Sequence, residues 1–256
     1  MLGAIAGDII GSSREFNPIK TVDFKLFPED AEFTDDTVLS VATADAILSS
    51  LGFSDAYKTY GRKYPEAGYG ARFDDWIYSE TSAPYNSFGN GSAMRVSPVG
   101  WAFETLEDVI KQAEASASVT HNHPEGIKGA VTTAGAIFLA RKGKRKQEIQ
   151  DFVVEKRGYN LSRKLDEIRP NYEFNEICQE TVPEAIICFL ESSDYESTVR
   201  NAISLGGDAD TLAAIAGSIA EAFYGGVPKD IEHEIWSRLD EDLTSVIQKF
   251  MMRYML

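Results

Sequence analysis

Apolar residues along this chain recur at helical spacing. One stripe occupies residues 2–9, and others with steps of three or four residues occupy 41–51 and 106–117. Steps of this size place apolar side chains on one face of an α-helix, where they can pack against a core. The pattern therefore predicts a first helix near the N-terminus, a second over 38–51 and a third over 106–117.

Proline and glycine mark the ends of further helices. Pro124 suits the first turn of a helix over 125–142 that ends near Gly143. Residues 211–224 are rich in alanine and end at Gly225-Gly226, a strong stop signal. Additional helices are expected over 182–192, 195–205 and 230–252. No run alternates with period two and no linker rich in proline or serine divides the chain, so the sequence predicts one compact all-α domain spanning residues 1–256.

The composition narrows the classes of function. Of the 256 residues, 43% are hydrophobic and 25% are charged, as in ordinary globular proteins, and no apolar run reaches the length of a membrane span. The formal net charge of −15 opposes general binding to nucleic acid. The N-terminal segment has no basic residue ahead of its apolar stretch and contains Asp8, so we expect a folded helix there and no secretory signal.

Cysteine and histidine are scarce. Cys178 and Cys188 lie in a region of helical pattern and suggest no disulfide framework, which favours a reducing compartment. With three histidines in the whole chain, a zinc site built on cysteine and histidine is a weak hypothesis. We expect a cytoplasmic monomer with no membrane partner.

Two acidic clusters stand at predicted helix starts. The first is FTDDT, residues 33–37, and the second is GGDADT, residues 206–211. One aspartate or threonine at such a position is an ordinary helix cap, whereas two aspartates with threonine exceed what a cap requires. If both clusters faced one cavity, four carboxylates would repel one another, and Mg²⁺ or Mn²⁺ would relieve the repulsion. For either motif alone, helix capping and metal binding are equally good interpretations. The presence of two such motifs favours a two-metal centre.

A glycine loop and a histidine segment are candidates for binding an anion. Residues 85–98 read YNSFGNGSAMRVSP, and the glycines let backbone N–H groups approach a diphosphate, aided by a helical turn predicted from Ala93. The same Asn-Gly pair also marks an ordinary turn. In THNHPE, residues 120–125, His123 is more simply a helix flank. His121 fits a structural role and a hydrogen bond to phosphate or ribose about equally.

Two further carboxylates are ambiguous on the sequence alone. Asp8 lies within the first predicted helix, where it is most simply a polar-face residue or a hydrogen-bonding residue between helices. Glu15 follows that helix in SSREF and by itself would be interpreted as a surface charge paired with Arg14 or solvent.

Taken in this order, the segments resemble the ADP-ribosylglycohydrolase family. The pairing of TDDT and GGDADT in one chain is specific, whereas residues 142–205 carry no recognised signature. The resemblance implies an all-α fold with a binuclear Mg²⁺ or Mn²⁺ site. The matching stretches span residues 3–225 and read GAIAGDIIGSSREF, FTDDTVLSVATADAIL, GYGARF, SFGNGSAMRVSPVGW, SVTHNHPEGIKGA and GGDADTLAAIAGSIAEAFYG.

The resemblance also implies roles for individual residues. Glu15 matches the glutamate of a mobile flap near the metals and, with Asp35, is a candidate acid or base. The positions that match the two metal-ligand triplets are Thr34, Asp35, Asp36, Asp208, Asp210 and Thr211. The positions that match the ADP-ribose site are Gly70, Ser87, Phe88, Gly89, Asn90 and His121, with Phe88 as the candidate for stacking on adenine.

These assignments predict a metal-dependent hydrolase that releases ADP-ribose from an acceptor, either a modified protein side chain or a small conjugate. Nearby carboxylates would stabilise the oxocarbenium-like charge that develops on the ribose as the glycosidic bond breaks. Two alternatives are a non-catalytic ADP-ribose-binding protein on the same fold and a two-metal phosphoesterase that cuts the diphosphate. The sequence does not distinguish among arginine, serine, nucleobase and O-acetyl linkages.

Overall fold

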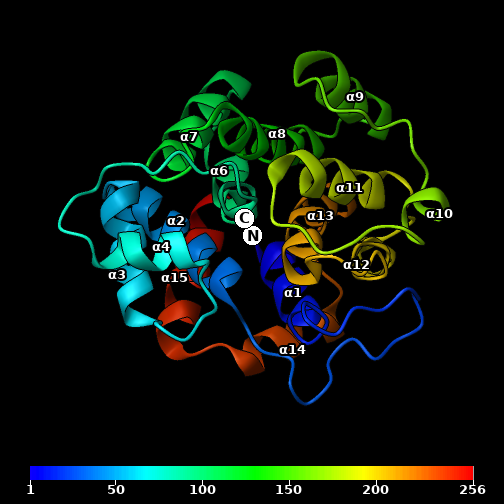
Figure 1. Ribbon diagram of the computed structural model, residues 1–256, viewed down its shortest axis with the longest axis horizontal. Coiled ribbons are helices and arrows are strands. Elements are labelled where there is room, and N and C mark those ends of the chain that lie inside the picture. The colour runs from blue at the N-terminus through cyan, green and yellow to red at the C-terminus, as the bar shows by residue number, and fades with distance from the viewer. Residues whose placement is uncertain (256) are drawn as a thin grey trace.

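The computed structural model describes residues 1–255, and within this range the chain forms helices and no strand (Figure 1). One isolated antiparallel bridge joins Gly89 to Ile177. The helices are α1 (Leu2–Ser12), α2 (Asp35–Ser49), α3 (Phe53–Lys63), α4 (Ala71–Tyr78), α5 (Gly91–Met94), α6 (Ser97–Ala102), α7 (Leu106–Ser118), α8 (Pro124–Arg141), α9 (Lys146–Asp151), the π-helix η1 (Phe152–Lys156), α10 (Leu165–Ile168), α11 (Cys178–Leu190), α12 (Tyr195–Ile203), α13 (Ala209–Tyr224), α14 (Lys229–Arg238) and α15 (Glu241–Tyr254). The prediction of an all-α fold is confirmed.

Helices α1 and α13 pack against each other near the middle of the molecule, and the other helices surround them (Figure 1). Three glycines spaced four residues apart, Gly3, Gly7 and Gly11, lie on the side of α1 that meets α13. A Cβ atom on Gly7 would lie 2.1 Å from the carbonyl oxygen of Ala213, and one on Gly11 would lie 2.4 Å from the Cα atom of Asp210. This glycine face therefore brings the two backbones into direct contact.

Three groups of buried apolar side chains form the core. The largest joins α1 and α13 to the flanking helices α11 and α12. A second group lies among α2, α3 and α4, and a third lies among α6, α7 and α8. The cores on both sides hold the starts of α2 and α13 in fixed positions, and these starts carry the two acidic clusters.

Most predicted helices are present, with shifted ends. The helix predicted over 125–142 is α8, and His123 caps it by accepting a hydrogen bond from the backbone N–H of Glu125. The helix predicted over 38–51 begins three residues earlier, at Asp35, and the one predicted over 211–224 begins at Ala209. The first two C-terminal predictions, 182–192 and 195–205, correspond to α11 and α12.

The prediction of one continuous helix over 230–252 was wrong. The chain forms two helices here, α14 and α15, with Leu239 in an extended conformation between them. The carboxylate of Asp240 accepts a hydrogen bond of 2.8 Å from the backbone N–H of Leu243 and so begins a new helix. The apolar pattern continues across the break, because both helices turn an apolar face to the same core.

The glycine face gives a stability prediction. Alanine is a better helix former than glycine, so Gly7→Ala would stabilise an isolated α1 by about 1 kcal/mol. In the folded protein the added methyl group meets the backbone of α13, and such overpacking destabilises by about 1–3 kcal/mol or more. We expect chemical denaturation to show a net loss of stability. Gly52→Ala is the matched control, because its Cβ would approach only the Asp55 carboxylate at 3.7 Å, and an unchanged midpoint for Gly7→Ala would contradict the contact.

Other expectations concern cysteines and membranes. Cys178 and Cys188 are both free and buried, in agreement with the expectation of no disulfide framework. No helix within residues 1–255 combines the length and the apolar composition that crossing a membrane requires.

Candidate active site

The starts of α2 and α13 open into one cavity of about 350 Å³. Asp35 and Asp36 occupy the first turn of α2, which Thr34 caps by accepting a hydrogen bond from the backbone N–H of Asp36. Asp208 is the N-cap residue of α13, and Asp210 lies in its first turn. The two clusters, far apart in the sequence, therefore share one cavity.

Side-chain hydrogen bonds link the two clusters. The Thr211 hydroxyl donates to the Asp36 carboxylate at 3.1 Å. The Thr34 hydroxyl lies 3.4 Å from a carboxylate oxygen of Asp210 and 2.7 Å from one of Asp8, so its single proton is shared between these acceptors. These contacts fix the relative orientation of the four aspartates on the two helices.

Asp8 holds α2 against α1. Its carboxylate accepts hydrogen bonds of 3.0 Å from the backbone N–H groups of both Thr34 and Thr37 and a further bond from the Thr34 hydroxyl. The interpretation of Asp8 as a hydrogen-bonding residue between helices is thus confirmed. Sequence reasoning missed its place beside the acidic cluster; an aspartate within an otherwise apolar helix was the available signal.

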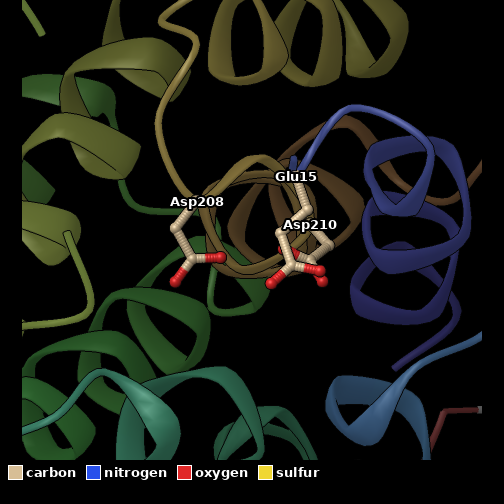
Figure 2. A group of neighbouring side chains, drawn as sticks. All are labelled: Glu15, Asp208 and Asp210. Atoms are coloured by element: carbon tan, nitrogen blue, oxygen red, sulfur yellow. The ribbon is translucent and has the colours of Figure 1, made fainter. Parts of the chain in front are cut away.

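Glu15 lies on the turn that follows α1, where its backbone N–H donates to the carbonyl of Ser12. Its side chain is half-buried and faces the start of α13 (Figure 2). Carboxylate oxygens of Glu15, Asp208 and Asp210 lie within 4.8 Å of one another. The alternative in which Glu15 is a surface charge paired with Arg14 is not what the structure shows.

Burial and mutual repulsion raise the pKa of these carboxyl groups. The pKa values of Asp35, Asp36 and Asp210 lie well above their usual range, first because the groups are buried and then because neighbouring carboxylates repel a further charge. Burial, with the charges of Asp210, Asp8 and Glu176, raises the pKa of Glu15 to about 8. Burial also raises the pKa of Asp208 to about 6.

The donor set suits hard divalent cations. One oxygen of Asp36, Oδ1, is buried with no hydrogen-bond partner among the residues described. A buried acceptor without a partner is unfavourable, and a cation coordinated by this oxygen would satisfy it and offset the repulsion among the carboxylates. Carboxylate and hydroxyl oxygens are the ligands that Mg²⁺ and Mn²⁺ prefer. The residues at the two helix starts therefore fit the cations that the sequence predicts.

The glycine loop forms another wall of the cavity. Backbone hydrogen bonds between Asn90 and Glu176 and between Cys178 and Phe88 hold this loop against the segment that precedes α11. The side-chain amide of Asn90 donates to the Asp208 carboxylate at 2.6 Å and to the Thr181 hydroxyl at 3.1 Å. Asn90 therefore positions Asp208. This contact is separate from the predicted role of Asn90 in binding ADP-ribose.

His121 and Phe88 also line the cavity. His121 is buried, and burial, followed by the charges of Arg95 and Arg72, places its pKa well below the usual range, so the ring is neutral. Phe88 is 42% exposed, and its ring centroid lies 5.3 Å from that of His123. An aromatic face that is partly open to the cavity is available for stacking.

The cavity collects every predicted site residue except Thr34, which caps α2 beside it. Gly70 lies at the wall, with no atom within 4 Å of the position of a Cβ. Sequence reasoning missed other lining residues, among them Arg72, Arg95, Glu176 and Ile177. The last two lie in the stretch without a recognised signature, and backbone contacts with the glycine loop bring them to the cavity.

The chain is similar in sequence and fold to known proteins. Human ADP-ribosylhydrolase ARH3 is 28% identical over 308 aligned positions, which cover 88% of this chain and 84% of the human protein. The ADP-ribosylarginine hydrolase Tri1 of Pseudomonas putida is 25% identical over 277 positions, covering 93% of this chain and 74% of that protein. A solved structure described as an ADP-ribosylglycohydrolase-related protein complex matches with a TM-score of 0.75 and 25% identity, over 98% of this chain and 95% of that chain.

The profile of one family extends over essentially the whole sequence. It is the profile of ADP-ribosylglycohydrolases, and it matches residues 1–255. The match includes both acidic helix starts, the glycine loop and the histidine segment that together line the cavity. The chain therefore belongs to the ADP-ribosylglycohydrolase family and is a hydrolase of ADP-ribose linkages.

Proposed function

We propose that this enzyme hydrolyses the glycosidic bond between ADP-ribose and an acceptor with the help of two divalent cations, Mg²⁺ or Mn²⁺. The observation that carries the proposal is that one cavity is lined both by the acidic helix starts and by the glycine loop with Arg72, Arg95 and His121, which we call the donor end. The residues that would hold the cations are Thr34, Asp35, Asp36, Asp208, Asp210 and Thr211. When bound, such cations polarise the oxygen atoms that they contact and offset the carboxylate charges.

The donor end suits the diphosphate of ADP-ribose. Here Arg72 and Arg95 contribute positive charge beside the glycine loop. A diphosphate at this end leaves the distal ribose beside the carboxylates, and Phe88 remains free to stack on adenine.

Glu15 is the proposed acid. The Glu15 carboxyl group is half-buried beside Asp208 and Asp210, and in its protonated form it can deliver a proton to the acceptor atom as the bond from that atom to the anomeric carbon breaks. The ribose then carries oxocarbenium-like positive charge, which the surrounding aspartates stabilise. Water adds to the anomeric carbon and gives up one proton to Asp35 or to the Glu15 carboxylate. The products are ADP-ribose and the protonated acceptor.

The acceptor leaves on the side of the 170–177 segment. Phe174 is 44% exposed and contacts Phe16, which is 78% exposed and follows Glu15 directly in the chain; the two ring centroids are 6.1 Å apart. Glu176, two residues after Phe174, lines the cavity. Exposed aromatic rings next to the proposed acid are well placed to contact a departing side chain, so this segment would influence which acceptors are accepted.

A release assay tests the proposed function. Arginine-, serine- and nucleobase-linked ADP-ribose and O-acetyl-ADP-ribose are each incubated with the enzyme and Mg²⁺ or Mn²⁺, and the products are separated by chromatography. Intact ADP-ribose from at least one conjugate is the expected product. AMP would identify a phosphoesterase, and binding without any product would identify a non-catalytic protein.

The glycine loop gives a prediction on affinity. In Gly89→Val, a Cβ atom lies 3.3 Å from the Glu176 carbonyl oxygen and 3.5 Å from Nε2 of His121, so the branched side chain narrows the donor end of the cavity. We expect calorimetry to show ADP-ribose binding at least tenfold weaker, roughly the effect of losing a hydrogen bond to a charged group. The control is Gly52→Val on the surface, and equal affinity in Gly89→Val and wild type would return the loop to a purely structural role.

A further inference from the structure

Arg95 is a fully buried cation in the wall of the cavity. Its Nη2 atom donates to the carbonyl of Ser116 and to the Thr120 hydroxyl, and its guanidinium lies 4.1 Å from the ring centroid of Tyr57. The other two nitrogens, Nε and Nη1, have no hydrogen-bond partner among the residues described. A buried arginine is usually paired with a carboxylate. Within residues 1–255, no carboxylate forms an ion pair with Arg95. Its charge therefore remains available to an anionic ligand.

The contact with Arg95 decides where the Thr120 hydroxyl directs its proton. An arginine can only donate, so the Thr120 oxygen accepts from Nη2 at 2.8 Å. The same oxygen lies 2.7 Å from Nδ1 of His121. If Nδ1 carried a proton and donated it, the hydroxyl proton of this fully buried threonine would be left with the neighbouring Tyr85 hydroxyl, a weaker acceptor than an imidazole nitrogen. Donation from Thr120 to Nδ1 satisfies all three groups.

This relay fixes the tautomer of His121. A neutral imidazole whose Nδ1 accepts a hydrogen bond carries its proton on Nε2. That nitrogen lies beside the glycine loop, 3.2 Å from the position of a Cβ on Gly91 and 3.5 Å from that on Gly89. Within the described part of the chain it has no hydrogen-bond partner, although His121 lines the cavity. The Nε2–H group therefore presents a free donor next to the loop.

We propose that Arg95 and Thr120 are positioning residues that hold His121 as a neutral Nε2–H donor for a phosphate oxygen of the ligand. The inference rests on the proposed function, because the anion is the diphosphate of ADP-ribose. Arg95 contributes twice: it directs the threonine proton to Nδ1, and its own charge favours an anion at this end of the cavity. Neither residue needs to touch the substrate for this effect.

The tautomer is measured directly by ¹⁵N NMR of the histidine rings. The chain has three histidines, so replacing His123 and His233 in turn assigns the signals of His121. In the wild-type protein we expect an unprotonated Nδ1 and a protonated Nε2 across the neutral range. A wild-type spectrum in which Nδ1 carries the proton overturns the proposal without any variant at Thr120.

Thr120→Val and Thr120→Ser form the matched pair. Valine keeps the shape of threonine and removes the hydroxyl, so a substantial Nδ1–H population and ADP-ribose binding about three- to tenfold weaker are expected in Mg²⁺-containing buffer. Serine keeps the hydroxyl and should retain the wild-type tautomer and an affinity within about twofold. A Thr120→Val protein with the wild-type tautomer and affinity contradicts the relay. If the wild-type protein has the expected tautomer but does not bind ADP-ribose, the failure belongs to the proposed function.

Discussion

Replacing Asp210 with asparagine should greatly lower the rate of hydrolysis and, at the same time, stabilise the cation-free protein near neutral pH. Asp210 is buried and lies beside Asp208 and Glu15, and its pKa is raised by burial and then by Asp208. A carboxyl group whose pKa is higher in the folded state contributes stability that is fully present below the unfolded pKa of about 3.9. That contribution is lost as the pH rises through the folded pKa. Asparagine carries no charge and avoids this loss.

The same change removes a proposed cation ligand. We expect turnover to fall by roughly a thousandfold, the scale on which the loss of a principal electrostatic group acts. Calorimetry at pH 7 with and without Mg²⁺ or Mn²⁺ measures both effects: the cation raises the melting temperature of the wild-type protein and leaves that of Asp210→Asn nearly unchanged. The control is Asp75→Asn, an exposed residue of α4. Wild-type activity that survives exhaustive chelation would exclude the two-cation proposal.

Glu15→Gln should lower turnover by roughly a hundred- to ten-thousandfold, the range typical of a lost acid–base group. Glutamine has nearly the same shape and cannot deliver a proton in the required way. The affinity for ADP-ribose should change little, because the contribution of an acid arises mainly in the transition state. Steady-state kinetics and calorimetric binding of ADP-ribose measure the two effects on the same protein.

A control variant in the segment between α1 and α2 separates a catalytic role of Glu15 from an effect on the conformation of this segment. Glu29 is exposed in the long segment between α1 and α2, and Glu29→Gln should leave turnover unchanged. Glu15→Gln with near-normal turnover would remove Glu15 from the catalytic residues. If turnover falls only modestly and the affinity for the cations changes, Glu15 helps to bind the cations and is not the acid.

The fold was predictable where local chemistry dominates. The periodic apolar stripes, Pro124 and the Gly225-Gly226 pair define helices by rules that act within a few residues. The break at Leu239 was missed because its signal, a capping aspartate three residues before Leu243, lies within an apolar pattern that two helices share.

The site was predictable only in part. The acidic helix starts and the glycine loop were visible as motifs, whereas their convergence depends on packing between distant segments. Arg95 was missed because arginine is seldom fully buried, and nothing adjacent to it in the sequence indicates the aromatic ring of Tyr57 or the hydroxyl of Thr120. The spacing of Gly3, Gly7 and Gly11 is a further signal for close helix contact, independent of the apolar stripes.

The glycine face also has a consequence for motion. Because α1 meets α13 backbone to backbone, no layer of side chains between them can change rotamer and let one helix slide past the other. Asp8 and Asp210 are then carried by what is mechanically one rigid body. Glu15 belongs to the chain that leaves this body after Gly11, which contacts the backbone of Asp210. Any movement of Glu15 relative to this body must therefore come from torsions at Ser12, Ser13 and Arg14, while the spacing of Asp8 and Asp210 stays constant.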